Sequence, residues 1–327
     1  MCTRVVYLGE GDRVITARSM DWNVDLGTNI WLFPRGMKRD GAAGPHSITW
    51  TSRYGSVVSS AYELATADGM NEKGLVANAL WLVESRYPDP HERRPTLSIA
   101  AWAQYALDNF ATVAEAVREL SAETFTVATS TVPGQERDAT MHLALSDSSG
   151  DSAIFEYLDG ELTVHHDRSY QVMTNSPPYA QQLAINSYWD EIGGTVMMPG
   201  TNRAADRYVR ASFYVNAVPQ VEDRTIATAA VFGVIRNASV PYGITTPGQP
   251  NISSTRWRTV ADHKDGRYYF DSVLWPSVIW VDLSDLDFSE SASPQKLDLT
   301  GGLPPAQGGD ASALFEPAAP FPFAGPE

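Results

Sequence analysis

The sequence predicts an antiparallel α+β fold in which helices cover sheets. Stretches typical of strands and of helices follow one another in blocks, without the regular alternation of a parallel α/β fold. A hydrophobic content of 43% with 19% charged residues indicates a globular protein with a sizeable core. No composition shift typical of a linker occurs before residue 289, so residues 2–288 are expected to form one domain.

The first third of the chain is rich in predicted strands. Two β-rich runs flank a turn at residues 9–12 and predict a hairpin that begins at Cys2. A second turn cluster is expected at residues 68–74 because Asp, Gly and Asn gather there. The strands expected in this part are residues 3–8, 13–19, 30–34, 47–59 and 75–83.

The remaining elements follow in alternating blocks. Apolar residues at helical spacing predict helices at residues 96–107, 112–120, 179–189, 203–218 and 224–235. The strands expected between and after them are residues 124–127, 142–145, 153–157, 162–165, 170–174, 255–262, 267–270 and 278–282. Residues 289–327 are rich in Pro, Gly, Ala and Ser and predict an extended arm, whose Phe residues suggest that it docks on a surface.

Charge and cysteine content exclude several functions. The 24 Lys and Arg residues against 39 Asp and Glu give a net charge of −15, which argues against nucleic acid as the main partner. No apolar run is long enough for a membrane span, and neither a metal-binding spacing nor a cofactor fingerprint occurs, so we expect no metal and no cofactor. As written, the chain shows no signal peptide and is expected to be cytoplasmic. A trimmed leader would instead place it in the periplasm or outside the cell.

Cys2 is the only cysteine in 327 residues and directly follows Met1. Removal of Met1 would leave one residue with both a thiol and a free α-amine, two groups that an amide hydrolase needs. Ordinary α-amines and thiols titrate close enough to neutral pH to exchange protons there. If the hairpin closes, Arg18 and Asp21 return beside Cys2. By position alone, an inert thiol and a charged pair at a strand end explain these residues equally well.

Five motifs in order resemble the choloylglycine hydrolase and penicillin V acylase family of N-terminal-nucleophile hydrolases. The resemblance extends from residue 2 to about residue 285, and five ordered motifs are far more specific than one. The motifs are Met1-Cys2-Thr3, Arg18-Ser19-Met20-Asp21-Trp22, Met70-Asn71-Glu72-Lys73-Gly74-Leu75, Met173-Thr174-Asn175-Ser176-Pro177 and Pro199-Gly200-Thr201-Asn202-Arg203-Ala204-Ala205-Asp206-Arg207.

The resemblance implies an αββα four-layer sandwich and hydrolysis of a linear amide by the N-terminal cysteine. It makes Cys2 the nucleophile, with its own α-amine as proton acceptor. Arg18 then favours the thiolate, and Asp21 orients the amine. Asn175 supplies a side-chain donor to the oxyanion, and Arg207 supports the site electrostatically.

Trp81 departs from the bile-salt branch of the family, which has Asn at this position. A side-chain donor role is therefore in doubt here, although the backbone N–H of Trp81 could still serve the oxyanion. Trp at this position is similar to the branch described from Gram-negative bacteria. Met20, Trp22 and Trp81 are expected to line an acyl pocket, with ordinary core packing as the alternative.

We interpret the chain as an amidohydrolase that removes the acyl group of penicillin V-like amides. An N-acyl-homoserine lactone acylase is the first alternative, and a conjugated bile-salt hydrolase is the second. A catalytically silent protein that binds acylated small molecules is the third. The resemblance also implies a homotetramer, in which the arm crosses to a neighbouring subunit or folds on its own.

Overall fold

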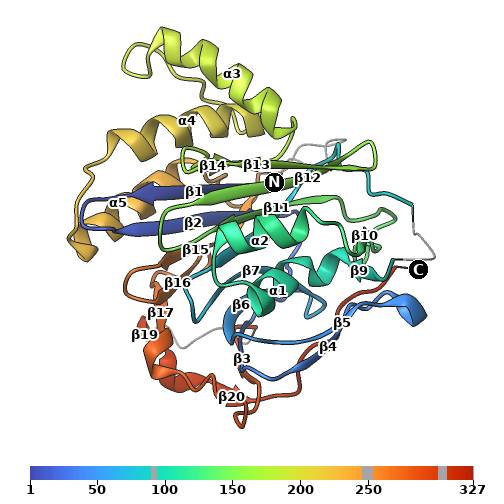
Figure 1. Ribbon diagram of the computed structural model, residues 1–327. Helices are drawn as coiled ribbons and strands as arrows, with labels where there is room; N and C mark the ends of the chain where they lie inside the picture. The colour runs from blue at the N-terminus through green and yellow to red at the C-terminus, as the bar shows by residue number, and fades with distance from the viewer. Residues whose placement is uncertain (90–93, 245–252, 301–307, 327) are drawn as a thin grey trace.

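Two large sheets form the centre of the computed structural model, and helices cover their outer faces (Figure 1). The structure describes residues 1–89, 94–244, 253–300 and 308–326. The layers follow the order helix, sheet, sheet, helix, which is the αββα sandwich that the family resemblance implies. Within the described residues, no helix has both the length and the apolar composition needed to cross a bilayer.

The first sheet carries the N-terminal hairpin at its centre. All its neighbouring strands are antiparallel except the last pair. In spatial order its strands are β14 (Val172–Met173), β1 (Cys2–Leu8), β2 (Val14–Asp21), β15 (Thr255–Asp262), β16 (Arg267–Ser272), β17 (Ile279–Asp282) and β19 (Gly309–Asp310).

The second sheet has nine strands and faces the hairpin. In spatial order they are β13 (Glu161–His166), β12 (Ser152–Leu158), β11 (Met141–Ser146), β8 (Val76–Trp81), β7 (Ala65–Asn71), β6 (Ser56–Ala61), β3 (Ile30–Phe33), β18 (Gln295–Leu297) and β20 (Glu316–Pro317). Two small ribbons complete the strands: β4 (Lys38–Asp40) with β5 (Thr49–Thr51), and β9 (Thr96–Ser98) with β10 (Thr126–Ala128).

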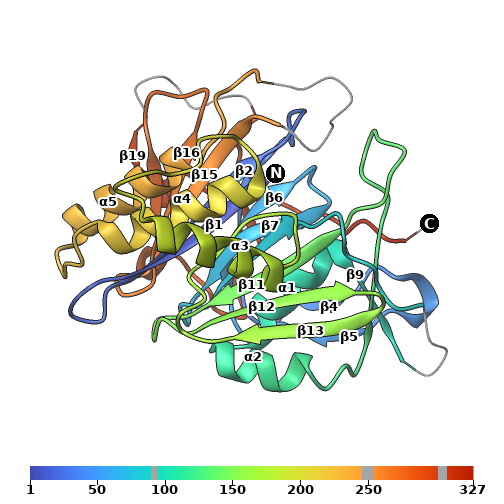
Figure 2. The same ribbon diagram turned by 90° about the horizontal axis from the view of Figure 1, so that it is seen from above.

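The helices divide between the two outer faces. The second sheet is covered by α1 (Ile99–Asn109) and α2 (Val113–Leu120). The first sheet is covered by α4 (Ala204–Ala217) and α5 (Arg224–Asn237), and α3 (Tyr179–Ile192) packs on the outside of α4 (Figure 2). Side-chain caps begin α1, α2 and α5, because Ser98, Thr112 and Asp223 each accept a bond from a first-turn N–H.

Both faces of the hairpin are buried. Every residue of β2 is buried, and only Leu8 of β1 is partly accessible. One face packs on α4 and α5, and the other packs on the second sheet. Polar side chains in these strands therefore cannot reach solvent and must find partners inside the protein. This burial is what assembles the site described below.

The structure corrects three predicted boundaries. Residues 47–59, predicted as one strand, form β5 and β6 with a turn between them. The predicted helix at 96–107 starts three residues later, because Thr96–Ser98 pairs with β10 and Ser98 caps α1. Residues 68–71, predicted as part of a turn, are the end of β7, and only the turn at Glu72–Gly74 follows. Asp68 tolerates a strand because its carboxylate is bonded inside the protein.

The described part of the arm lies on its own chain. It contributes β18 and β20 to the second sheet and β19 to the first, so it contains pairings that the sequence did not predict. In Figure 1 this red segment runs from β19 past β20 and ends beside β9 and β10. These strands are only two or three residues long, which is too short to produce a recognisable strand pattern in the sequence.

Candidate active site

The register of the N-terminal hairpin places two arginines beneath the cysteine. Cys2 lies opposite Met20, and Arg4 lies opposite Arg18. Opposite residues, and residues two apart in a strand, share one face. These four side chains therefore point toward the second sheet. Arg4 ties the two sheets together by donating to Leu145 O at 3.1 Å, and burial lowers its pKa to about 10.

Arg18 contacts the cysteine sulfur from inside the sandwich. Its guanidinium donates to Cys2 Sγ at 3.2 Å, and the side chain is fully buried. It also donates to Ala67 O at 3.2 Å and to Ala79 O at 3.1 Å. The β7–β8 pairing ends at Asp68 and Asn78. Arg18 thus donates hydrogen bonds to two carbonyls that lie beyond the end of the β7–β8 pairing. It also places its guanidinium beside the thiol.

Asp68 lies behind Arg18 and was not predicted as part of the site. The carboxylate accepts from Asn78 Nδ2 at 2.5 Å and from the Tyr268 hydroxyl. Burial raises the pKa of Asp68, while the charge of Arg18 opposes that rise. Tyr268 is 200 residues away in the chain, so no local sequence signal marks this group.

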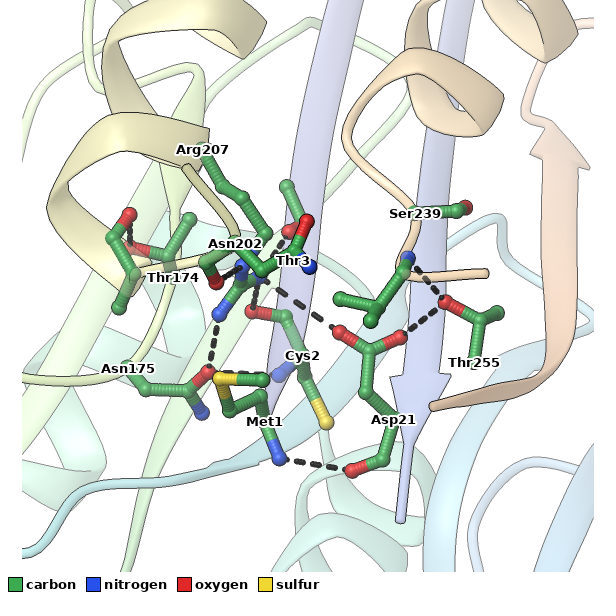
Figure 3. A network of polar contacts seen from close by, with 12 residues as sticks. Met1, Cys2, Thr3, Asp21, Thr174, Asn175, Asn202, Arg207, Ser239 and Thr255 are labelled. Carbon is green, nitrogen blue, oxygen red and sulfur yellow. Dashed lines mark hydrogen bonds and ion pairs between the residues drawn. The ribbon is translucent and has the colours of Figure 1, made fainter. Parts of the chain in front are cut away.

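Arg207 reaches Cys2 from α4, on the opposite face of β1 (Figure 3). Its guanidinium donates to Cys2 O at 2.6 Å, to Asn175 Oδ1 at 2.8 Å and to the Thr3 hydroxyl. Its acidic partner is Asp21, at 3.7 Å from Arg207 NH1 to Asp21 Oδ2. Burial lowers the pKa of Arg207, and the negative charge of Asp21 works against this.

Asn175 links the backbone of Cys2 to the second sheet. Its Oδ1 accepts from Cys2 N at 2.6 Å as well as from Arg207, and its Nδ2 donates to Trp81 O at 2.7 Å. An amide nitrogen carries two hydrogens, so one remains for another acceptor. Gln182 holds the segment in place by donating to the carbonyls of Asn175 and Pro177.

Asp21 lies at the end of β2, next to the start of β1. Its Oδ1 accepts from Thr255 at 2.6 Å. Its Oδ2 is buried and has no hydrogen-bond partner within the described residues. The Met1 α-ammonium donates to the backbone carbonyl of Asp21 at 2.7 Å, and burial lowers the pKa of this ammonium group.

A buried cluster of Glu156 and two histidines supports the segment that carries Asn175. Glu156 accepts from the backbone N–H of Tyr179 at the start of α3 and from His142 Nδ1 at 3.0 Å. Burial would raise the pKa of Glu156, but hydrogen bonds from His142 and His165 lower it to about 2. His142 Nε2 also contacts Thr174 O at 2.8 Å, one residue before Asn175.

An apolar cavity opens at the sulfur of Cys2. It is lined near the sulfur by Met20, Trp22 and Trp81, the three residues expected to form a pocket. The Trp22 and Trp81 rings lie 5.4 Å apart, and the Arg137 guanidinium lies over both, at 5.1 and 4.5 Å from their centroids. This placement favours a pocket over ordinary core packing.

The structure therefore gathers every residue predicted for the site. Cys2, Arg18 and Asp21 come from the hairpin, and Asn175 and Arg207 arrive from segments more than 150 residues away. The Trp81 carbonyl accepts a hydrogen bond from Asn175, and Trp81 also lines the cavity. Their arrangement brings a thiol, a guanidinium and hydrogen-bond donors together.

The chain is similar to known proteins over nearly its whole length. A family model described as linear amide C–N hydrolases of the choloylglycine hydrolase family matches residues 2–298. A penicillin V acylase from Pectobacterium atrosepticum is 55% identical, over 99% of this chain and 92% of that protein.

Solved structures show the same likeness. The structure of penicillin V acylase from Agrobacterium tumefaciens is 60% identical and covers 99% of this chain and 100% of that one, with a TM-score of 0.92. A conjugated bile acid hydrolase from Clostridium perfringens shares the fold at 20% identity and a TM-score of 0.78, covering 91% of this chain and 96% of that one.

Proposed function

Because the chain belongs to the choloylglycine hydrolase family of linear amide C–N hydrolases, we propose that it removes the acyl group of penicillin V-like amides with Cys2 as nucleophile. The observation that carries the proposal is the position of Cys2. Its sulfur lies 3.2 Å from Arg18, its nitrogen bonds Asn175, and both stand at the mouth of an apolar cavity.

In the first half of the reaction, the sulfur attacks the amide carbonyl carbon. Removal of Met1 frees the α-amine of Cys2, which takes the thiol proton as the C–S bond forms. The Arg18 guanidinium stabilises negative charge on the sulfur. The α-ammonium then returns the proton to the leaving nitrogen as the C–N bond breaks, which leaves a thioester on Cys2.

In the second half, water attacks the thioester. The α-amine accepts a proton from the water, the C–S bond breaks, and the carboxylic acid leaves with the thiol restored. Asn175 and Asp21 keep the amine in place. Asn175 Oδ1 accepts from Cys2 N, and Asp21 Oδ2 offers a buried negative oxygen that carries no hydrogen bond in the described structure.

Two N–H groups are assigned to the oxyanion in this mechanism. The second hydrogen of Asn175 Nδ2 is one of them. The other is the backbone N–H of Trp81. In an antiparallel ladder the N–H and C=O of one residue point to the same side of the strand. The Trp81 carbonyl points to Asn175, so its N–H faces that side too. Leu82 N–H, one residue on, bonds Thr140 on β11, as the alternation requires.

The acyl group is expected to occupy the apolar cavity. Trp22 and Trp81 offer two aromatic faces for a phenoxyacetyl ring or a fatty chain. Trp22 is held by a bond from its indole N–H to the Tyr62 hydroxyl at 2.6 Å. The indole nitrogen of Trp81 is buried without a partner in the described structure, so it can donate to a polar atom of the acyl group.

A substrate panel tests the proposal. Mass spectrometry first establishes whether Met1 is absent. The protein is then assayed with penicillin V, penicillin G, glycocholate and short- and long-chain N-acyl-homoserine lactones. We expect turnover of penicillin V that disappears in Cys2→Ala. Retained activity in Cys2→Ala, or full activity with Met1 present, would contradict the mechanism. Preference for glycocholate would contradict the substrate assignment.

Self-association through α3 and the segment after it is part of the proposal. Large apolar side chains are exposed there, with Tyr188 62%, Val196 80% and Met197 60% accessible. In Figure 1, α3 projects from the outer face of the molecule. A homotetramer predicts that Met197→Glu lowers the mass measured by light scattering. Leu274→Glu, on an exposed residue of another loop, serves as the matched control.

A further inference from the structure

The end of the C-terminal arm reaches the apolar cavity that opens at Cys2. Ala324 lines this cavity together with Leu64 and Ala100. The Ala324 N–H donates to Leu64 O at 2.8 Å. The Ser98 hydroxyl, which caps α1 by accepting from Ala100 N, donates its own proton to Ala324 O. Both backbone polar groups of Ala324 are therefore tied to the segments that form this part of the cavity.

Aromatic packing holds the arm in this position. Phe321 is only 6% exposed, and its ring lies 5.4 Å from Trp31 and 5.7 Å from Phe33. The Phe323 ring packs edge-to-face against Phe321, with the ring centroids 5.5 Å apart. The burial of Phe321 against two aromatic rings therefore anchors this segment to the second sheet.

Close backbone contact continues on the far side of Ala324. A Cβ added to Gly325 would meet Ala42 O at 2.5 Å. Only glycine permits this approach without displacement of the neighbouring backbone. Residues 321–325 are thus fixed on both sides of the cavity wall.

The position of Ala324 limits the length of the cavity. Ala67 marks the end at the nucleophile, since its carbonyl accepts from Arg18. Leu64, which is bonded to Ala324, precedes Ala67 by three residues. Three residues of chain span at most about 10 Å. Ala67, Leu64 and Ala324 all line the same cavity as Cys2, so an acyl group that extends from Cys2 past Ala67 toward Leu64 approaches Ala324.

We propose that residues 321–325 form the distal wall of the acyl pocket and set the longest acyl chain that the enzyme accepts. This inference rests on the proposed function, because it places the acyl group in the cavity. The wall belongs to the same chain as Cys2. A larger side chain at position 324 is expected to shorten the pocket.

Two opposite perturbations test the wall. Ala324→Leu extends a side chain into the cavity, whereas deletion of residues 320–327 removes the wall. Ala319→Leu is the matched control, since Ala319 is an exposed alanine of the same arm. The substrates are N-acyl-homoserine lactones of increasing chain length together with penicillin V, compared by kcat/KM.

We expect Ala324→Leu to lower kcat/KM for the longest accepted chain at least about 10-fold relative to the shortest. The deletion is expected to shift the preference toward longer chains, and Ala319→Leu is expected to leave the ratio unchanged. A folded Ala324→Leu variant with the wild-type chain-length ratio would overturn the proposal, whatever the deletion does to stability.

A second readout separates this inference from the proposed function. Calorimetric binding of free carboxylic acids of increasing length reports on the wall without catalysis. If wild-type protein hydrolyses none of the amides, the proposed function fails. The wall stands if Ala324→Leu still selectively loses affinity for the longer acids, and it falls if the affinities of the two proteins follow the same length dependence.

Discussion

Asn175 performs two tasks that different substitutions can separate. Its Oδ1 accepts from Cys2 N and Arg207, and its Nδ2 donates to Trp81 O. The proposed mechanism assigns the second hydrogen of Nδ2 to the oxyanion. Asn175→Ala removes both tasks. Asn175→Asp keeps an oxygen at the Oδ1 position for the two donors but removes the N–H group.

The magnitudes follow from these contacts. Loss of one oxyanion donor raises the activation free energy by roughly 3–4 kcal/mol, or about 100- to 1000-fold in turnover. Both variants are therefore expected to lose this much. Asn175→Ala also leaves two buried donors without an acceptor, at about 1–3 kcal/mol each. Asn175→Asp sets a carboxylate oxygen against the Trp81 carbonyl, but its new charge strengthens the bond from Arg207, which offsets this repulsion.

Steady-state hydrolysis of penicillin V and thermal unfolding test the two tasks independently. We expect kcat and kcat/KM to fall together in both variants, as for an interaction made only in the transition state. We expect a lower Tm for Asn175→Ala than for Asn175→Asp. Turnover of Asn175→Asp within a few-fold of wild type would remove the side-chain N–H from the mechanism. Equal Tm values would refute the assigned acceptor role.

Three further predictions concern the buried titratable side chains Arg18, Asp21 and His263. Arg18→Lys keeps the charge but cannot span the sulfur and two carbonyls. We expect roughly 10- to 100-fold slower turnover and slower alkylation of Cys2 by iodoacetamide, and unchanged alkylation would contradict its effect on the thiol. Asp21→Asn leaves Arg207 without its acidic partner, so urea unfolding is expected to show a loss of about 3 kcal/mol or more. A loss below 1 kcal/mol, on the scale of an exposed pair, would speak against this pairing. Burial lowers the pKa of His263 to about 4, so the neutral ring is favoured in the folded state. Because the unfolded chain binds this proton more readily, the free energy of unfolding falls as the pH drops from about 6.5 toward 4. His263 lowers it by at most about 3 kcal/mol over this range. His263→Gln should flatten the free energy of unfolding in this window, and an unchanged pH dependence would count against the assignment.

The fold was largely predictable because its strands and helices have local signals. The strand at residues 255–262 has the predicted bounds, and the helices over 112–120 and 224–235 differ only at their ends. The failures share a cause. Asp68 reads as a turn residue in isolation, but in the structure its carboxylate is bonded by Asn78 and Tyr268, so it can lie in a strand. Tertiary contacts of this kind override local preference.

For some site residues the sequence predicted that they lie close together, and for others only that they belong to the site. Cys2, Arg18 and Asp21 lie on one hairpin, so chain connectivity alone brings them together. Asn175 and Arg207 were placed by motif resemblance, which gives identity and order but no geometry. Only the structure shows the orientation of the Asn175 side chain. Its oxygen accepts from the backbone nitrogen of Cys2, and its nitrogen donates to Trp81 O.

By itself, the sequence determined which groups this protein brings to the reaction: a single thiol near the chain start, two arginines, an aspartate, an asparagine and a set of aromatic side chains. Only the tertiary structure decided that Arg18 fills the open end of a β ladder and that Ala324 closes the pocket. The physical reason is that both positions depend on buried backbone groups, which every residue type carries. Such groups leave no pattern in the sequence, yet burial obliges each of them to find a partner.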